Sequence, residues 1–311
     1  MLKESTVKRF CNDYSLPIQI YNPDFIEYYI DLYDKVYDTK AKYELFKTAV
    51  NEFKTEDEFL AYGNELQETV LNYIKNVAEY TDLCNCNINE LYPLQNNLEG
   101  VRYTKTVNLY RQDNSGKDFI SFDMRRANYQ ALKFYNSKIV NNTNTYEEFI
   151  SKFTDKEYFK QSKHIRQYIF GKLNHDRIVH LERYLMQKVL FFLFDCEYEP
   201  EDIVTYTTDE VIVHNTDDNR KGKSFCNSAS HSIKNYTDGL DIRVESFRLN
   251  YIGHNTYVKE FKYQNPVFKG GSSVYMPQIY KHYFNMPIKD IDLCFLYEKQ
   301  PSKFLNPLEW N

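Results

Sequence analysis

The segment ISFDMRRANYQAL places one carboxylate and two cations at the junction of two predicted elements. Its apolar run has the pattern of a strand that ends at Asp123; Arg125 and Arg126 follow, and a helical pattern begins there. Carboxylate oxygens are hard ligands that bind Mg²⁺ or Mn²⁺, and arginines at a helix start can hold the phosphates of a nucleotide. An aspartate at such a junction is, however, more often the N-cap of the helix.

A second pair of carboxylates stands at the tip of a predicted hairpin. In TYTTDEVIVH, apolar residues flank Asp209 and Glu210, where a purely structural turn would usually carry Asn-Gly or Asp-Gly. If this hairpin lies beside the strand that ends at Asp123, the two aspartates meet at one sheet edge and repel each other unless a cation lies between them. Two divalent ions about 4 Å apart support in-line phosphoryl displacement, so the pattern predicts nucleotidyl transfer.

Between these two segments, SKHIRQYIFGKLN is predicted to form a helix with one cationic face. At about 100° per residue, Lys163, Arg166, Phe170 and Asn174 fall within about 80° of one another. The cations could contact a triphosphate, or they could belong to an ordinary solvated helix face. In a later predicted strand, Lys259 could contact a primer phosphate or flank a sheet edge.

The three segments resemble, in order and in predicted structure, motifs A, B and C of palm-domain nucleic-acid polymerases. ISFDMRRANYQAL is similar to motif A, in which a strand ends in a metal-binding Asp, and SKHIRQYIFGKLN looks like motif B. TYTTDEVIVH is similar to motif C, and its tip resembles both the His-Asp-Glu of family A and the Tyr-Gly-Asp-Thr-Asp-Ser of family B DNA polymerases. The resemblance covers residues 101–263, about half of the chain.

The resemblance implies a set of site residues. The catalytic residues would be Asp123, Asp209 and Glu210, with Asp123 and Asp209 as ligands of Mg²⁺ or Mn²⁺. The nucleotide-binding residues would be Arg125, Arg126, Asn128, Tyr129, Lys163, Arg166 and Asn174, and Lys259 would bind nucleic acid. Either Asn128 or Tyr129 would contact the sugar. The chain departs from the family B pattern at Thr207, where an acid is expected, and it lacks the aromatic-Gly pair of a family A motif B.

The pattern around these segments predicts an α+β protein with an antiparallel, split βαβ sheet and an N-terminal helical subdomain. The resemblance implies that this sheet is a polymerase-like palm. The predicted subdomain comprises residues 1–98, the palm comprises 99–263 with fingers-like helices inserted at 125–195, and a small C-terminal lobe comprises 264–311. NPDFIEYYIDLYDKVYDT and TEDEFLAYGNELQETVLNYIKNV have helical periodicity and helix-start signals. VRYTKTVNLYR alternates and is predicted to form a hairpin with FISFD.

Charge is distributed unevenly along the chain. The 311 residues carry a formal net charge of -5, but the first 100 hold 9 Lys/Arg against 18 Asp/Glu, whereas the remaining 211 hold 30 against 26. The acidic helices predict a protein partner, although they could equally be core elements. The weakly basic remainder is compatible with nucleoside triphosphates and with DNA or RNA as partners, and also with an ordinary solvated surface.

Several classes of protein are excluded or disfavoured. Hydrophobic residues make up 42% of the chain, which argues against disorder. With no 18-residue apolar run and no signal-peptide core, the expectation is a cytoplasmic protein without membrane contact, in the host cytoplasm if it is viral. The abundance of Lys, Asn, Ile, Tyr and Phe is typical of AT-rich genomes, such as those of many phages and large viruses. Motifs of P-loop, dinucleotide-binding, zinc-protease and acyl-transfer sites are absent.

Two further functions remain open at this point. One is a catalytically inactive palm-like subunit that binds nucleic acid or takes part in assembly. The other is a non-templated nucleotidyltransferase or cyclase that uses the same carboxylates. Neither template type nor primer requirement follows from the sequence.

Overall fold

The computed structural model describes residues 2–95, 97–98, 100–103, 108–216 and 223–310, and it is an α+β protein, as predicted. Within these residues the main sheet is antiparallel, with the strand order β4-β5-β3-β6-β7-β8. Its strands are β3 (Asp118–Met124), β4 (Ile203–Tyr206), β5 (Glu210–His214), β6 (Ile242–Gly253), β7 (Thr256–Glu260) and β8 (Val267–Gly270). Two short antiparallel pairs lie outside it: β1 (Asn97–Leu98) with β2 (Val101–Arg102), and β9 (Cys294–Tyr297) with β10 (Gln300–Lys303).

The helices form an N-terminal group, a group inserted between β3 and β4, and two later helices. The N-terminal group comprises α1 (Glu4–Asp13), α2 (Pro23–Tyr37), α3 (Thr39–Asn51), α4 (Glu56–Asn76), α5 (Ala78–Asn85) and α6 (Ile88–Leu91). The inserted group comprises α7 (Ala127–Tyr135), α8 (Tyr146–Ile150), α9 (Glu157–Gln161), α10 (Lys163–Gly171) and α11 (His175–Asp195). The later helices are α12 (Lys223–Tyr236) and α13 (Met276–Tyr283).

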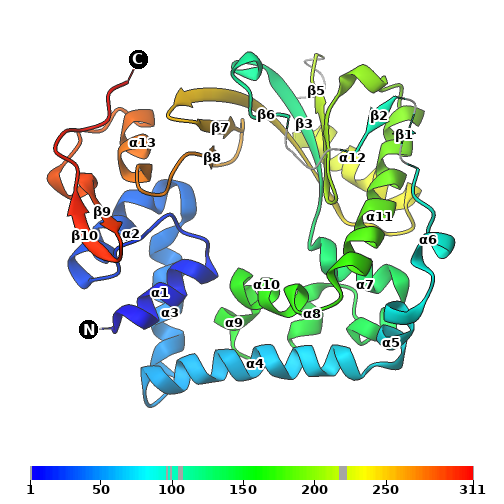
Figure 1. Cartoon of the computed structure of the whole chain (residues 1–311), viewed down its shortest axis with the longest axis horizontal. Helices are drawn as coiled ribbons and strands as arrows, with labels where there is room; N and C mark the ends of the chain where they lie inside the picture. The colour runs from blue at the N-terminus through cyan, green and yellow to red at the C-terminus, as the bar shows by residue number, and fades with distance from the viewer. Residues whose placement is uncertain (1, 96, 99, 104–107, 217–222, 311) are drawn as a thin grey trace.

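Side-chain alternation in β3 gives the sheet one apolar face and one mixed face. Ile120, Phe122 and Met124 point to one side, where they share a core with α11 and α12. Figure 1 shows these two helices against the sheet. Ser121 and Asp123 alternate with the apolar residues and therefore lie on the opposite face. The carboxylate of interest is thus on the face turned away from the α11–α12 core.

The structure contradicts the predicted hairpin between residues 101–111 and 119–123. β3 is hydrogen-bonded to β5 along one side and to β6 along the other, so neither side is left for another strand. In the earlier segment, Asn108 donates from its backbone N–H to Thr205 Oγ1 at 3.2 Å, and residues 104–107 lie outside the described part of the chain. Alternation predicts which face a strand buries, but it does not identify the neighbouring strand.

The predicted helix starts are confirmed in the N-terminal group. Asn22 caps α2 by accepting a hydrogen bond from Phe25 N at 3.1 Å. Thr55 caps α4 by accepting one from Glu58 N at 3.1 Å. Each cap satisfies an N–H group that has no partner inside its helix. The long helix α4 can therefore begin sharply at the edge of the molecule, where Figure 1 shows it.

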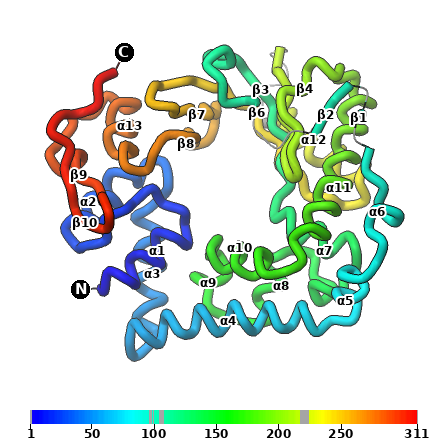
Figure 2. Tube along the Cα trace, in the orientation of Figure 1, coloured from blue at the N-terminus to red at the C-terminus, as the bar shows by residue number. Residues whose placement is uncertain are grey.

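The N-terminal helices share their hydrophobic core with the helices inserted between β3 and β4. Phe46 of α3 and Phe59 of α4 pack against Tyr158 of α9, with ring centroids 5.5 and 5.6 Å apart. Figures 1 and 2 show that the elements follow one another around a ring, with α1–α3 next to the C-terminal segment. The division into three domains stays a prediction; β8 extends the main sheet beyond residue 263.

Candidate active site

The register of the sheet brings the three predicted carboxylates together. Asp123 lies opposite Glu210 in the β3–β5 ladder, and directly opposed residues have Cβ atoms about 5 Å apart on the same face. Asp209 belongs to the turn between β4 and β5, and its carbonyl oxygen accepts a hydrogen bond from Met124 N at 2.7 Å. This bond fixes the turn beside the end of β3. Asp123, Asp209 and Glu210 therefore form one group, called the acidic cluster below.

Negative charges within the acidic cluster raise the pKa of two of its carboxylates. Partial loss of hydration raises the pKa of Asp209, and the negative charges of Asp123 and Glu210 raise it further. Burial also raises the pKa of Asp123; the guanidinium of Arg243 opposes that rise, and Glu210 adds to it. Like charges held this close favour either protonation or a bound cation.

Two cations lie against members of the acidic cluster. Arg243 of β6 places its Nη2 atom 2.9 Å from Asp123 Oδ2. Lys259 of β7 places its Nζ atom 3.3 Å from Glu210 Oε1, which also accepts a hydrogen bond from Ser121 Oγ at 2.6 Å. Burial lowers the pKa of Lys259, and Glu210 opposes this effect. Lys259, which was predicted to contact nucleic acid, is thus a buried lysine whose ammonium group faces the acidic cluster.

Glu182 of α11 is a fourth carboxylate at this place. It is 4% exposed and accepts a hydrogen bond from Asn128 Nδ2 at 2.5 Å. Burial and then the charge of Asp209 raise the pKa of Glu182 to about 8, against the effect of the Asn128 hydrogen bond. Asn128 is one of the two residues predicted to contact a nucleotide sugar, so Glu182 holds its amide in one orientation.

The acidic cluster can supply part of the ligands of a divalent cation, and substrate phosphates and water would supply the rest. Among the described residues, no three His, Cys, Asp or Glu side chains converge as a ready-made metal centre. Mg²⁺ is often held by only one or two protein carboxylates, while substrate phosphates and water supply the other ligands. Asp123 and Asp209 fit this arrangement because each carries a hard oxygen donor and the charge of Asp123 acts on Asp209.

Helix α10 and the start of α7 contribute a strip of positive charge. Burial and then the charge of Arg126 lower the pKa of Arg166, whose guanidinium lies 5.7 Å from the Tyr146 ring centroid. Partial burial and then the charge of Arg166 lower the pKa of Lys163. Arg126 also pairs with Glu147 at 2.8 Å. Three predicted phosphate-binding residues are therefore close enough to influence one another.

Arg125 and Tyr129 lie apart from this strip. Arg125 is exposed and lines a surface pocket with Arg243 and Lys262. Tyr129 is 2% exposed and donates a hydrogen bond to Thr143 O at 2.8 Å. Of the two residues considered for the sugar, Tyr129 is part of the core, and Asn128 is the one beside the acidic cluster.

The predicted helix SKHIRQYIFGKLN ends earlier than expected. α10 stops at Gly171, and Asn174 is the N-cap of α11, where its Oδ1 atom accepts a hydrogen bond from Arg177 N at 3.3 Å. The prediction that Asn174 shares a helix face with the α10 cations is therefore wrong. Glycine disfavours helix and asparagine favours the N-cap, so the two residues together break the segment. Phe170 lies on α10 as predicted, but it is buried in the core.

Glu182 and Arg243 belong to the site but were not among the predicted site residues, although the sequence carries a signal for each. Glu182 stands four residues after Ile178 and three before Leu185, so it is an acid on the apolar face of a helix. Arg243 follows the buried Ile242 in an alternating strand, which places it on the opposite face. An isolated charge in an apolar stripe is unusual because it must find a partner when buried.

No family model, curated protein or solved structure matches this chain. None of the described helices has both the length and the apolar character needed to cross a membrane.

Proposed function

We propose that the protein is a metal-dependent nucleotidyltransferase with a polymerase-like palm, which adds nucleotides to a 3′-hydroxyl under the direction of a template. The observation that carries the proposal is the adjacency of Asp123 and Asp209, two acids far apart in the chain. An antiparallel sheet with helices against one face is compatible with a palm, and the order of the three motif-like segments supports the same function.

In this proposal, Asp123 and Asp209 hold Mg²⁺ or Mn²⁺, and Glu210 is an auxiliary carboxylate. When bound, such ions supply activation of the attacking hydroxyl and stabilise the leaving oxygens. Arg243 and Lys259 offset part of the negative charge of the cluster while the metal is absent.

The remaining site residues would bind and orient the nucleotide. Lys163 and Arg166 hold the triphosphate, since the charge of Arg126 acts on Arg166 and that of Arg166 acts on Lys163, so the three cations are close to one another. Asn128, fixed by its hydrogen bond to Glu182, contacts the sugar. Arg125, in the pocket that it shares with Arg243, would contact a phosphate only at the margin of the site.

Primer extension in the presence of Mg²⁺ tests the proposal. Asp123→Asn and Asp209→Asn each remove one charge from the acidic cluster with little change in volume. Because loss of one preorganised electrostatic group costs about 10²–10³ in rate, we expect each variant to lose at least two orders of magnitude in activity. Asp241→Asn, an exposed aspartate immediately before β6, is the matched control and should keep wild-type activity. Equal extension by all four proteins, or none by the wild type, would contradict the proposal.

A catalytically inactive nucleic-acid-binding subunit is the second candidate. The ion pairs Arg243–Asp123 and Lys259–Glu210 favour it, because they already neutralise two of the three carboxylates without a metal. This candidate predicts binding that is independent of Mg²⁺ and unchanged by Asp209→Asn, together with no extension. A non-templated transferase would instead extend a primer with the same nucleotides whatever the template sequence.

A further inference from the structure

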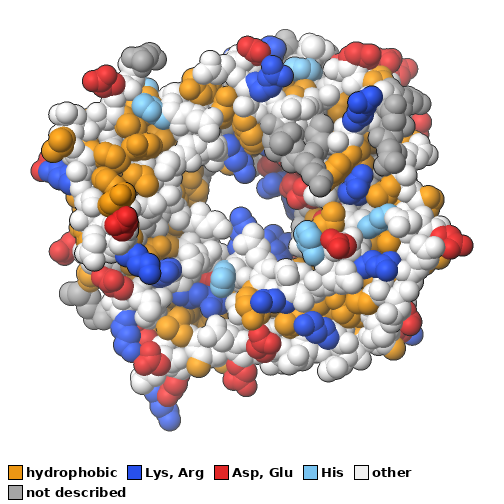
Figure 3. Space-filling model, viewed as in Figure 1, with side chains coloured by type: hydrophobic (Ala, Val, Ile, Leu, Met, Phe, Trp, Pro, Cys, Tyr) orange, Lys and Arg blue, Asp and Glu red, His pale blue; other side chains and the backbone are white. Residues whose placement is uncertain are grey.

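The molecule has an opening that its elements enclose on all sides. Figures 1 and 2 show the main sheet, the C-terminal segment, helices α1–α3 and helices α7–α10 arranged around it. The space-filling view in Figure 3 shows that side chains do not fill the opening, and that Lys and Arg side chains gather around its edge. A ring of this kind requires firm contacts wherever segments distant in sequence meet.

The first such junction joins α1 to α9 and α10 through the buried Asp13. Its carboxylate accepts hydrogen bonds from Tyr158 Oη at 2.5 Å and from Ser162 Oγ at 2.6 Å. Arg9 Nε lies 3.0 Å from the same carboxylate, and the Arg9 and Asp13 side chains are 9% and 0% exposed. A charge buried with several donors holds the joined segments in one arrangement, since separating them would strand it.

The second junction joins α2 to the C-terminal segment through the buried Asp292. Tyr28 Oη donates to Asp292 Oδ1 at 2.6 Å, and Lys281 Nζ of α13 lies 2.7 Å from Asp292 Oδ2. The Lys281 and Asp292 side chains are 2% and 0% exposed. The C-terminal segment is tied to the sheet in turn, because Tyr283 Oη donates to Glu260 Oε1 at 2.6 Å. The ring is therefore closed by buried polar contacts at both junctions.

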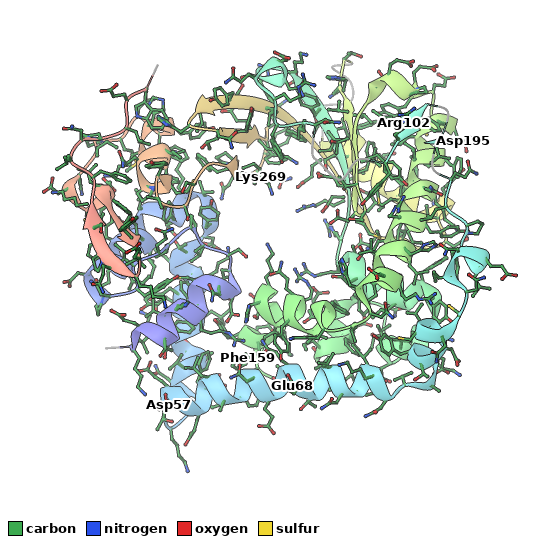
Figure 4. The ribbon with its side chains drawn as sticks, viewed as in Figure 1. Asp57, Glu68, Arg102, Phe159, Asp195 and Lys269 are labelled. Atoms are coloured by element: carbon green, nitrogen blue, oxygen red, sulfur yellow. The ribbon has the colours of Figure 1, made fainter. Side chains whose placement is uncertain are left out.

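A lysine on one side of the opening is close enough to the other side for a cation there to affect its pKa. The charges of Arg166, on the same helix, and of Lys269, on β8, both lower the pKa of Lys163 after partial burial has done so. Figure 4 shows Lys269 at the edge of the opening. Among the described residues, neither Lys163 nor Lys269 has a carboxylate within ion-pair distance. Like charges that face each other without counter-charges favour a polyanionic ligand between them.

The ligand between these lysines is an extended polyanion. Lys163 belongs to α10 and Lys269 to β8, on opposite sides of the enclosed opening, so a chain of phosphates that passes through it can contact both. A single strand of nucleic acid is such a chain, and it is the template that the proposed function requires.

We propose that a single strand of nucleic acid passes through this opening, so that the protein encircles its strand. Lys269 contacts a phosphate of the strand, and Lys163 contacts another while no nucleoside triphosphate occupies that lysine. This inference rests on the proposed function for its class of ligand, which is nucleic acid. It adds that the bound strand is surrounded by the ring. Because the ring is closed in the free protein, a strand enters by threading a free end.

End-blocked oligonucleotides test the threading. Oligothymidylate with biotin at both ends is presented to the wild-type protein either free or with streptavidin on both ends, and association is followed by fluorescence anisotropy without nucleotides or metal. We expect the association rate to fall at least tenfold when both ends are blocked and by no more than about half when only one is blocked, since one free end remains. Equal rates with both ends blocked, or no binding to the open oligonucleotide, would overturn the proposal.

A pair of substitutions tests the two lysines. Lys163→Ser/Lys269→Ser should weaken binding to the open oligonucleotide about tenfold or more, and should reduce the slope of log K against log salt by about 1.4, because each lost phosphate contact on a single strand contributes about 0.7. Lys54→Ser/Lys75→Ser removes two exposed lysines at or near α4 and should change neither. An unaltered salt slope in the first variant, with its circular dichroism and melting temperature unchanged, would contradict the assignment of the lysines.

These measurements separate the inference from the proposed function. End-dependent binding without primer extension supports encirclement and rejects the transferase. Extension by a protein that binds blocked and open oligonucleotides at equal rates supports the transferase and rejects encirclement.

Discussion

Glu182 is the carboxylate of the site whose ionisation is most altered by its surroundings. Burial and the charge of Asp209 raise its pKa to about 8, from an ordinary value of 4.5. Between these values the unfolded chain has released the proton that the folded chain retains. The unfolded state then binds fewer protons, so stability falls as pH rises through this range. Below about pH 4 the effect of Glu182 is absent, and above about pH 8 its destabilising effect is complete.

Replacing Glu182 with Gln should remove this pH dependence while keeping the hydrogen bond from Asn128. We expect the melting temperature of the wild type to decline between about pH 5 and pH 8, and that of Glu182→Gln to decline less, because each unit of pKa shift corresponds to about 1.4 kcal/mol. Differential scanning fluorimetry over this range measures the difference. Glu201→Gln, at an exposed glutamate, should follow the wild type; parallel curves for Glu182→Gln and the wild type would show that Glu182 is not protonated in the folded state.

The break between α10 and α11 decides which cations face the opening. Because α10 ends at Gly171, its direction is independent of the long helix α11 that packs against the sheet. Asn174 starts α11 by satisfying an N–H group of its first turn. Asn174 therefore has a structural role at the start of α11, and its contribution should appear in the free energy of unfolding.

Replacing Asn174 with Ala should lower the free energy of unfolding by about 1 kcal/mol, within the range of about 0.5–2 kcal/mol found for lost N-caps. Urea denaturation followed by circular dichroism measures the change. Asn72→Ala, at an exposed position inside α4, is the control and should be nearly neutral. A variant of Asn174 with unchanged stability but weakened nucleotide binding would restore the ligand-binding role that the sequence suggested.

Elements with strong local signals could be predicted from the sequence. α2 and α4 carry N-caps and helical periodicity, and the β4–β5 hairpin has apolar arms around a polar tip, so short-range patterns are sufficient. The adjacency of Asp123 and Asp209 also follows once the hairpin is placed beside β3, because the end of β3 and the hairpin tip then meet at one edge of the sheet. The paired strands of β3 did not follow from neighbouring sequence, because β6 comes more than a hundred residues later and register depends on long-range packing.

Only part of the site could be predicted from the sequence, because some of its residues come from distant elements. Asp123, Asp209 and Glu210 stand in short motif-like segments, whereas Arg243 and Glu182 reach the acidic cluster from β6 and α11. Their roles depend on burial and on through-space charge. A local pattern can mark such residues as unusual, but it cannot identify their partners.

At the scale of the whole molecule, the ring joins segments from the two ends of the chain. Tyr28 and Asp292 are 264 positions apart and form a hydrogen bond at 2.6 Å. The sequence shows an acidic N-terminal part and a small C-terminal helix, but nothing in either indicates that they meet. This contact determines whether the opening is enclosed, so the stability of the junction determines how the protein can load onto a strand.

Breaking the Lys281–Asp292 pair from one side should be costly because Asp292 is left buried without its counter-charge. For Lys281→Met we expect a loss of about 3–5 kcal/mol in the free energy of unfolding. Lys281→Met/Asp292→Asn removes both charges and keeps an oxygen for Tyr28, so it should recover most of that loss. Urea denaturation gives the free energies, and hydrogen exchange should show faster exchange in α13 than in β3 for the single variant alone. Equal destabilisation of the two variants would mean that packing, not the buried charge, closes the ring at this junction.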